Sequence, residues 1–169
     1  MVREIYLAGG CFWGLEKYLE NIPGVISTEV GYANGNTNNP SYEDVCHKNT
    51  GHAETVKVEY DTDRIRLEFL LEQYYDVIDP TSENRQGGDT GSQYRTGIYF
   101  LLNEDKEIAQ KSLLELQKKY NEKIVVEVMP LHNYTRAEEY HQKYLNKHKN
   151  GYCHIPSSKF IQAKTAVEK

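Results

Sequence analysis

The sequence predicts a single two-layer domain, either α+β or α/β, in which helices pack on a small sheet. Strand-like and helix-like segments alternate along the 169 residues, without internal repeats or an obvious linker. A chain of this length can bury a core of its own, so it needs no disulfide staple. Two long polar loops rich in Gly, Asn and Tyr interrupt the pattern. Loops this long in a compact domain are usually functional or disordered, and we expect these two to be functional.

The first predicted strand and helix are separated by a change in the spacing of the apolar residues. Residues 4–8 (EIYLA) predict a short buried strand, and from Cys11 the apolar residues recur at helical spacing until about residues 21–24. Residues 25–35 predict a second strand, which leads into the first long loop. The alternating segment HAETVKVEYD, residues 52–61, predicts a third strand.

The later elements show the same alternation. The segment 62–81 predicts a helix with Asp61 or Thr62 near its cap, and residues 82–94 form the second long loop. A strand at 96–102, a charged amphipathic helix, a strand at 123–131 and a helix at 135–148 should follow, the last opened by a Thr135–Glu138 capping box. The remainder reads as loop and tail. We therefore divide the chain into a catalytic domain, 1–155, and a C-terminal tail, 156–169.

Composition and charge exclude several classes of function. The net charge is −5 and the pI about 5.7, with no basic block, so nothing indicates nucleic-acid binding. The apolar runs are too short for a membrane span, and the N-terminus lacks a signal-peptide pattern. Three widely spaced cysteines fit a reducing compartment, where a disulfide would be transient. We expect a soluble, cytoplasmic protein.

Cys11 is the first candidate for chemistry. It follows a strand and a Gly pair and begins a helix, where free N–H groups and the helix dipole favour a nucleophilic thiolate. A buried structural cysteine is the alternative. Phe12 and Trp13 point about 100° apart on a helix, so both cannot face the same core. We expect one of them, preferentially Trp13, to line a pocket.

Glu54 is the second candidate. Strand parity places it on the same face as Val56 and Val58, toward the core. A carboxyl group there should have a raised pKa and could act as a general acid. The alternative is that Glu54 lies at the strand end, where parity no longer forces burial. His52 shares the parity, but we interpret it as structural or solvated.

The remaining candidates are weaker when taken singly. Tyr42 lies in the first long loop, Asp89 and Tyr94 lie in the second, and each could be solvated. His141 falls on the apolar stripe of the last predicted helix, where a core histidine is usual. We interpret Cys46 as a small packed residue. Cys153 lies in a segment that could swing to meet an oxidised Cys11.

Five segments together resemble the A-type peptide methionine sulfoxide reductases, in order from about residue 4 to 155. They are GGCFWG, GHAETVKVEYD, DPT, GDTGSQYRTGIYF and AEEYHQKYL, and the combination of GCFWG with GHAE is highly specific. The resemblance implies reduction of the S epimer of methionine sulfoxide, free or in oxidised proteins, with recycling by thioredoxin or another dithiol. It implies no metal or organic cofactor. With it, we expect an α+β two-layer sandwich, a mixed sheet with a ferredoxin-like core and long functional loops, in a monomer.

The same resemblance implies a role for each site residue. Cys11 is the nucleophile that becomes a sulfenic acid, and Glu54 is the acid at the sulfoxide oxygen. Phe12 and Trp13 form the apolar wall for the substrate methyl group, with Tyr42 and Tyr94 as donors to the oxygen. Asp89 and His141 line the site. Cys153 matches the resolving position, with Cys46 or an external thiol as alternatives.

Two other functions deserve comparison. A metal-binding module could use Cys46, His47, His52, Cys153 and His154, but no CxxC is present and the spacing matches no standard zinc pattern. A thiol peroxidase could use the same Cys11, but it would need neither Glu54 nor an aromatic wall. The CFW aromatics favour a methyl-bearing substrate instead.

Overall fold

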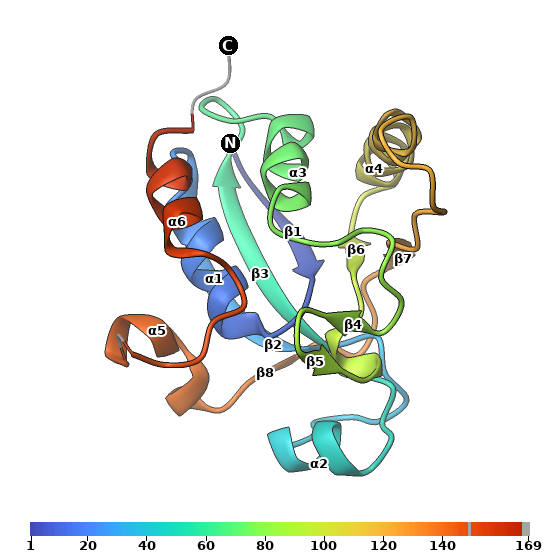
Figure 1. Cartoon of the computed structure of the whole chain (residues 1–169), viewed down its shortest axis with the longest axis vertical. Coiled ribbons are helices and arrows are strands. Elements are labelled where there is room, and N and C mark those ends of the chain that lie inside the picture. Colours follow the sequence, from blue (N-terminus) through green and yellow to red (C-terminus); the bar gives the residue numbers. More distant parts are fainter. Residues whose placement is uncertain (149, 167–169) are drawn as a thin grey trace.

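The computed structural model describes residues 1–148 and 150–166, and in this part of the chain six strands form one mixed sheet in the order β7-β6-β1-β3-β2-β8 (Figure 1). The strands of this sheet are β1 (Val2–Ala8), β2 (Val25–Ala33), β3 (Ala53–Asp61), β6 (Gly97–Phe100), β7 (Glu127–Pro130) and β8 (Thr135–Arg136). A separate ribbon pairs β4 (Arg85–Gln86) with β5 (Asp89–Thr90). The helices are α1 (Phe12–Glu20), α2 (Tyr42–His47), α3 (Leu67–Tyr75), α4 (Asn103–Gln117), α5 (Tyr144–Lys147) and α6 (Ser157–Lys164), with 3-10 turns η1 (Ser92–Tyr94) and η2 (Glu139–His141).

The core of the sheet is a split β-α-β arrangement. β3 lies between β1 and β2 and is antiparallel to both, and β6 is antiparallel to β1. The chain order β1-α1-β2-β3-α3-β6 is therefore that of a ferredoxin-like core. β7 joins β6 in parallel, which makes the sheet mixed. The predicted α+β fold is confirmed.

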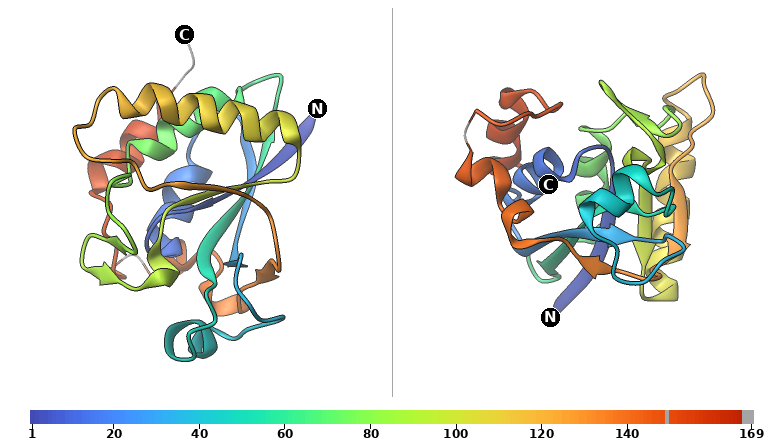
Figure 2. Two further views of the ribbon diagram at one scale, coloured as in Figure 1. Left: turned by 90° about the vertical axis from the view of Figure 1, so that its right-hand side faces the viewer. Right: turned by 90° about the horizontal axis from the view of Figure 1, so that it is seen from below.

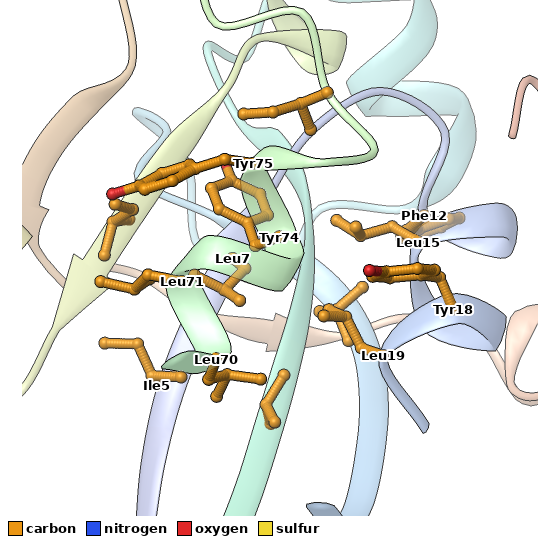
Figure 3. Packing of buried hydrophobic residues seen from close by; sticks show 14 of the residues in the cluster. Ile5, Leu7, Phe12, Leu15, Tyr18, Leu19, Leu70, Leu71, Tyr74 and Tyr75 are labelled. Carbon is orange, nitrogen blue, oxygen red and sulfur yellow. The ribbon is translucent and has the colours of Figure 1, made fainter. Parts of the chain in front are cut away.

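One face of the sheet carries the main apolar core. Leu15, Tyr18 and Leu19 of α1 and Leu70, Leu71 and Tyr74 of α3 pack against the strands on either side of β3 (Figure 3). Each of these side chains is fully buried, and burying one large apolar side chain is worth about 1.5–3 kcal/mol. This packing fixes the position of α1 relative to the ends of β1 and β3.

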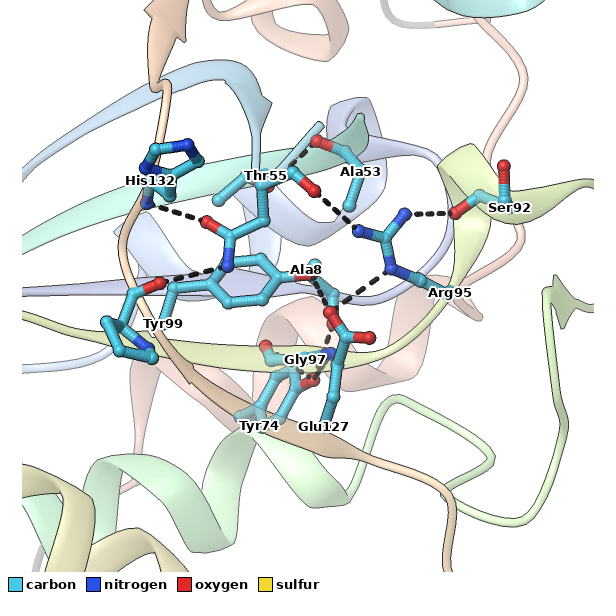
Figure 4. Close-up of polar contacts among 12 residues, drawn as sticks. Ala8, Ala53, Thr55, Tyr74, Ser92, Arg95, Gly97, Tyr99, Glu127 and His132 are labelled. Carbon is cyan, nitrogen blue, oxygen red and sulfur yellow. Dashed lines mark hydrogen bonds and ion pairs between the residues drawn. The ribbon is translucent and has the colours of Figure 1, made fainter. Parts of the chain in front are cut away.

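The opposite face holds a polar network that fixes the second long loop. Arg95, directly after η1, donates hydrogen bonds to the carbonyl oxygens of Ser92 (2.9 Å) and Asn34 (3.2 Å) and to the Glu127 carboxylate (3.2 Å) (Figure 4). Tyr99 donates to the same carboxylate at 2.7 Å. One guanidinium therefore connects the start of β6, the first long loop and β7.

The predicted helix over 135–148 is wrong. Thr135 pairs with Tyr32 in β8, and the Glu138 carboxylate accepts hydrogen bonds from the Tyr32 hydroxyl (2.8 Å) and the Tyr42 N–H (3.0 Å). Lys143 then adopts a left-handed conformation, with φ 55°. These contacts with distant residues replace the local capping box, so only the short η2 and α5 form.

Three further boundaries differ from the predictions. The helix predicted from residue 62 begins at Leu67, with Arg66 as its N-cap, because Asp61 still belongs to β3. The first long loop contains α2, which is closed by a capping box between Ser41 and Asp44. The segment predicted as loop and tail contains α6, whose Ala163 is buried and which packs on α1. None of the helices within 1–148 and 150–166 is both long and apolar enough to cross a bilayer.

Candidate active site

Cys11 lies at the junction of β1 and α1, where its thiol is mostly buried. The strand ends at Ala8, the chain turns through Gly10 with φ +79°, and Cys11 forms the N-cap of α1. The N–H of Gly10 donates a 3.1 Å hydrogen bond to the carbonyl of Tyr94, which joins this turn to η1. A left-handed conformation favours glycine. The turn places the start of α1 at the end of the sheet that α2, α5 and the β4–β5 ribbon also approach (Figures 1 and 2).

The electrostatic surroundings of Cys11 favour the thiol. Burial raises the pKa of Cys11 well above its usual value, and the negative charge of Glu54 adds to this effect. The backbone N–H of Trp13 lowers the pKa, but by less. The prediction that the helix start favours a thiolate on Cys11 is therefore wrong for the resting site: at 8% exposure, burial raises the pKa by more than the Trp13 N–H lowers it.

Glu54 is buried beside the start of α1, as strand parity predicts. The Glu54 side chain lies in β3 at 1% exposure, so the alternative of an exposed strand end is excluded. Its Oε1 accepts a 3.1 Å hydrogen bond from the N–H of Phe12, and its Oε2 is buried without a hydrogen-bond partner among the described residues. Burial raises the pKa of Glu54 to about 8, which the Phe12 N–H opposes and Asp89 reinforces. The carboxyl group therefore keeps its proton at neutral pH.

Two tyrosine hydroxyls face the same region from the two long loops. Tyr42 begins α2 and Tyr94 ends η1, and both rings are partly buried against the core. Burial, followed by the charge of Glu54, raises the pKa of each hydroxyl, so both remain hydrogen-bond donors. The Tyr42 hydroxyl also interacts with the Cys46 thiol. Cys46 therefore lies next to the candidate site, which its sequence context did not indicate.

The aromatic residues after Cys11 divide as helical geometry predicts. Phe12 is fully buried, with its ring 5.3 Å from that of His141. Trp13 is only partly buried and stacks on Tyr144 at a centroid distance of 3.7 Å. The Trp13 indole N–H donates a 3.0 Å hydrogen bond to Nδ1 of His141. Tyr144 had no distinguishing signal in the sequence, because its partner lies 131 positions away.

A C-terminal segment covers this region. The Tyr152 hydroxyl donates a 3.2 Å hydrogen bond to Asp89, and the Cys153 thiol lies against Gly14 of α1. Cys153 is a free, partly buried thiol, as are Cys46 and, more deeply buried, Cys11. Asp89 and Cys153 both raise the pKa of Cys11, so both lie within electrostatic reach of it. The sequence-predicted residues from both loops, α1, β3 and the C-terminal segment thus converge.

The remaining candidates lie elsewhere or have structural roles. His52 is buried, and its Nε2 lies 2.7 Å from the carbonyl of Thr37, which fits the structural interpretation. Among the described residues, no three His, Cys, Asp or Glu side chains are placed to hold a metal ion. A large hollow between α3 and α4 contains none of the site residues.

The fold and the site together define an α+β protein in which a buried cysteine at a helix start lies within electrostatic reach of a protonated carboxyl group, beside a cluster of aromatic side chains. The sequence profile of the family "Peptide methionine sulfoxide reductase" matches residues 3–169. A peptide methionine sulfoxide reductase MsrA from Lachnoclostridium phytofermentans is 60% identical over 166 residues, which cover 98% of this chain and all of that protein. The chain belongs to the peptide methionine sulfoxide reductase family and is an oxidoreductase that reduces methionine sulfoxide.

Solved structures agree with this assignment. Mxr1 from Saccharomyces cerevisiae in its reduced form superimposes with a TM-score of 0.86 at 37% identity, over 90% of this chain and 88% of that one. Methionine sulfoxide reductase A of Corynebacterium diphtheriae gives 0.82 at 36% identity, over 92% and 84%. Mxr1 has also been solved in complex with Trx2, and this form gives 0.61 at 29% identity, over 85% and 84%.

Proposed function

We propose that the chain reduces the S epimer of methionine sulfoxide, free or in oxidised proteins, through a sulfenic acid on Cys11. The observation that carries the proposal is the state of Glu54. This buried carboxyl group is protonated at neutral pH, one of its oxygens accepts a hydrogen bond from the Phe12 N–H, and the other has no partner within residues 1–148 and 150–166. Such a group can donate its proton to a substrate oxygen placed beside the Cys11 thiol.

Activation of the sulfoxide oxygen is the first requirement of the reaction. A sulfoxide sulfur is a poor electrophile until its oxygen is protonated or strongly hydrogen-bonded. Glu54 donates the proton, and the Tyr42 and Tyr94 hydroxyls donate hydrogen bonds to the same oxygen. Donors fixed in advance in a buried site stabilise developing charge more strongly than water does.

The Cys11 sulfur then attacks the activated sulfur. The oxygen passes from the methionine sulfur to the Cys11 sulfur, so methionine gains two electrons and Cys11 loses two. The proton lost by the thiol replaces the one that Glu54 donates, and the oxygen ends as the hydroxyl of the Cys11 sulfenic acid. Because burial holds Cys11 in its thiol form, proton loss accompanies substrate binding rather than preceding it.

The aromatic residues recognise the methyl group at the end of the substrate side chain. Phe12 and Trp13 supply an apolar wall for the methyl group on the sulfur, and His141 fixes the indole through its hydrogen bond. Asp89 lines the site from the β4–β5 ribbon. An apolar contact on one side and oxygen donors on the other orient the sulfoxide for attack.

Resolution and recycling complete the cycle. Cys153 condenses with the sulfenic acid, and thioredoxin or another dithiol reduces the resulting disulfide. The complex of Saccharomyces cerevisiae Mxr1 with Trx2 supports a thioredoxin partner. The reaction as written needs neither a metal nor an organic cofactor. We assign this chemistry to residues 1–155 of a cytoplasmic monomer that does not bind nucleic acid.

Mutation of each cysteine tests the proposal. Cys11→Ser should abolish reduction of a sulfoxide substrate, and persistent activity would refute the nucleophile assignment. Cys153→Ser should still form about one methionine per enzyme, but should lose thioredoxin-driven turnover. Mass spectrometry after one turnover should find Cys11 joined to Cys153; a bond to Cys46 would reassign the resolving thiol. A peroxidase would instead consume hydrogen peroxide as rapidly in Glu54→Gln as in the wild type.

A further inference from the structure

Gly14 leaves space that the Cys153 sulfur occupies. A Cβ atom built on Gly14 would lie 2.8 Å from Sγ of Cys153, closer than real Cβ contacts allow. The thiol also donates a 3.4 Å hydrogen bond to the carbonyl of Ile155, and Ile155 is itself buried against the core. Any side chain at position 14 would displace the sulfur.

The position of Gly14 in α1 relates this space to Cys11. Cys11 is the N-cap and Gly14 the third helical residue. Residues three positions apart lie on the same face of a helix. The Cys153 thiol also contributes to the raised pKa of Cys11, so the two thiols lie within electrostatic reach of each other beside the first turn of α1, although both are free.

Lys17 lies one turn further along the same helix. Its ammonium is 4.9 Å from the ring centroid of Phe160 in α6, which holds it by a cation–π contact. Burial raises the pKa of the Cys153 thiol overall, and the positive charge of Lys17 opposes this rise by favouring the thiolate. Other titratable groups near this thiol include Cys11 at the helix start and Tyr152 and His154 on its own segment; burial lowers the pKa of His154, so its ring is neutral at neutral pH.

We propose that the first two turns of α1 hold the resolving thiol of Cys153 in place: Gly14 supplies the space for its sulfur, and Lys17 supplies a positive charge. We call this arrangement the seat. The two are positioning residues: they act through Cys153 and do not touch the substrate. The proposal rests on the proposed function of Cys153. It also gives α6 a role, because Phe160 holds Lys17 in place.

The seat serves the second chemical step. The Cys153 sulfur attacks the Cys11 sulfenic sulfur, an S–S bond forms, and the S–O bond breaks. The thiol proton leaves with the hydroxide as water. The oxidising equivalents come from the sulfoxide, so no further oxidant is needed. A thiol already lodged one turn from Cys11 needs only a small movement to react.

Gly14→Ala tests the space. Alanine favours a helix more than glycine does, so the variant should fold. In quenched single-turnover experiments, methionine formation should stay within about twofold of wild type, while disulfide formation should slow about tenfold or more. The matched control is Gly88→Ala, whose new Cβ would meet only the Tyr152 hydroxyl oxygen, at 3.9 Å. The proposal would be refuted if Gly14→Ala formed the disulfide at the wild-type rate. It would also be refuted if methionine formation and disulfide formation slowed equally.

The Cys153→Ser background separates this inference from the proposed function. With a small dithiol as reductant, adding Gly14→Ala to Cys153→Ser should cause no further loss, because the two changes act on one step. A further loss of activity in the double variant would refute the proposal. If Cys153→Ser alone kept thioredoxin-driven turnover, the resolving role itself would be wrong, whatever Gly14→Ala does.

Lys17 variants test the charge. Lys17→Gln should slow disulfide formation several-fold and move its pH profile to higher pH, because the thiolate loses a favourable charge. Lys17→Arg keeps the charge and should restore both. Methionine formation should be unchanged in the two variants. An unshifted pH profile in Lys17→Gln would remove Lys17 from the seat.

Discussion

The indole N–H of Trp13 donates a 3.0 Å hydrogen bond to Nδ1 of His141, and this bond determines the state of the histidine. Nδ1 acts as an acceptor, so the neutral ring carries its proton on Nε2, which is buried and has no hydrogen-bond partner in the part of the chain that the structure describes. Burial lowers the pKa of His141, so the neutral form prevails at neutral pH. The bond thus links the residue after the nucleophile to a ring from a segment about 130 positions away.

This pair can be observed directly because Trp13 is the only tryptophan of the chain. We expect its fluorescence to stay constant at and above neutral pH and to change only below pH 6.5, the ordinary histidine value, because protonated Nδ1 cannot accept the bond. His141→Phe should shift the emission at pH 7, remove the transition and raise KM more than it lowers kcat. His132→Gln, on an exposed residue, is the control. An emission spectrum unaffected by His141→Phe would contradict the assigned contact.

The parts of the site that the sequence predicted depend on short-range regularity. The period change at Cys11 predicts the start of α1, and the alternation in residues 52–61 predicts burial of Glu54; both are properties of a few adjacent residues. Glu54 is buried on the same face as Val56 and Val58, although at this end of β3 its neighbours Ala53 and Thr55 on the other face are buried as well. Neither inference requires knowing which distant segments pack against these residues.

The parts that it missed depend on contacts between distant segments. Glu138 looks like a capping residue locally, but its carboxylate is bonded to Tyr32 and Tyr42, 106 and 96 positions away. The ionisation state of Cys11 was mispredicted for the same reason, because local sequence shows the helix start but not the burial around it. In both cases the local sequence pattern indicates the weaker of two competing effects, and the stronger effect comes from distant residues.

Glu54→Gln should abolish most of the activity without disturbing binding. Glutamine fits the same space and can still accept the Phe12 hydrogen bond, but it cannot donate a proton to the sulfoxide oxygen. We expect kcat to fall by about 10²–10⁴-fold, the usual worth of a general acid, while KM changes little. Wild-type activity should also fall above about pH 8, as Glu54 loses its proton. A variant that kept the wild-type rate would remove Glu54 from the mechanism.

Tyr42→Phe and Tyr94→Phe should each remove one donor to the oxygen. Both hydroxyls stay protonated at neutral pH, so each substitution removes a hydrogen bond and no charge. We expect kcat/KM to fall about tenfold or more for either, and further for the double variant. Tyr140→Phe, an exposed ring beside His141, is the control. If both single variants were as active as wild type, neither tyrosine would serve the oxygen.

The raised pKa of Glu54 also predicts how the stability of the protein should depend on pH. Its pKa is about 8 in the folded state and near 4.5 when unfolded, so the folded state binds its proton more tightly. The stabilising effect of that proton is complete below pH 4.5 and is lost as pH rises to 8, because folding must then take up a proton or bury a charge. The loss is about 1.4 kcal/mol per pH unit within this window.

Replacing the buried acid should therefore change the slope of stability against pH. Glu54→Gln carries no titrating proton, so its free energy of unfolding should rise relative to wild type by on the order of 3 kcal/mol between pH 5 and pH 8. Urea unfolding at several pH values gives this difference directly. Glu59→Gln, which removes a half-exposed carboxylate on the same strand, is the matched control. A difference between Glu54→Gln and wild type that stays constant from pH 5 to 8 would mean that Glu54 is already ionised at neutral pH, and the acid role would fail with it.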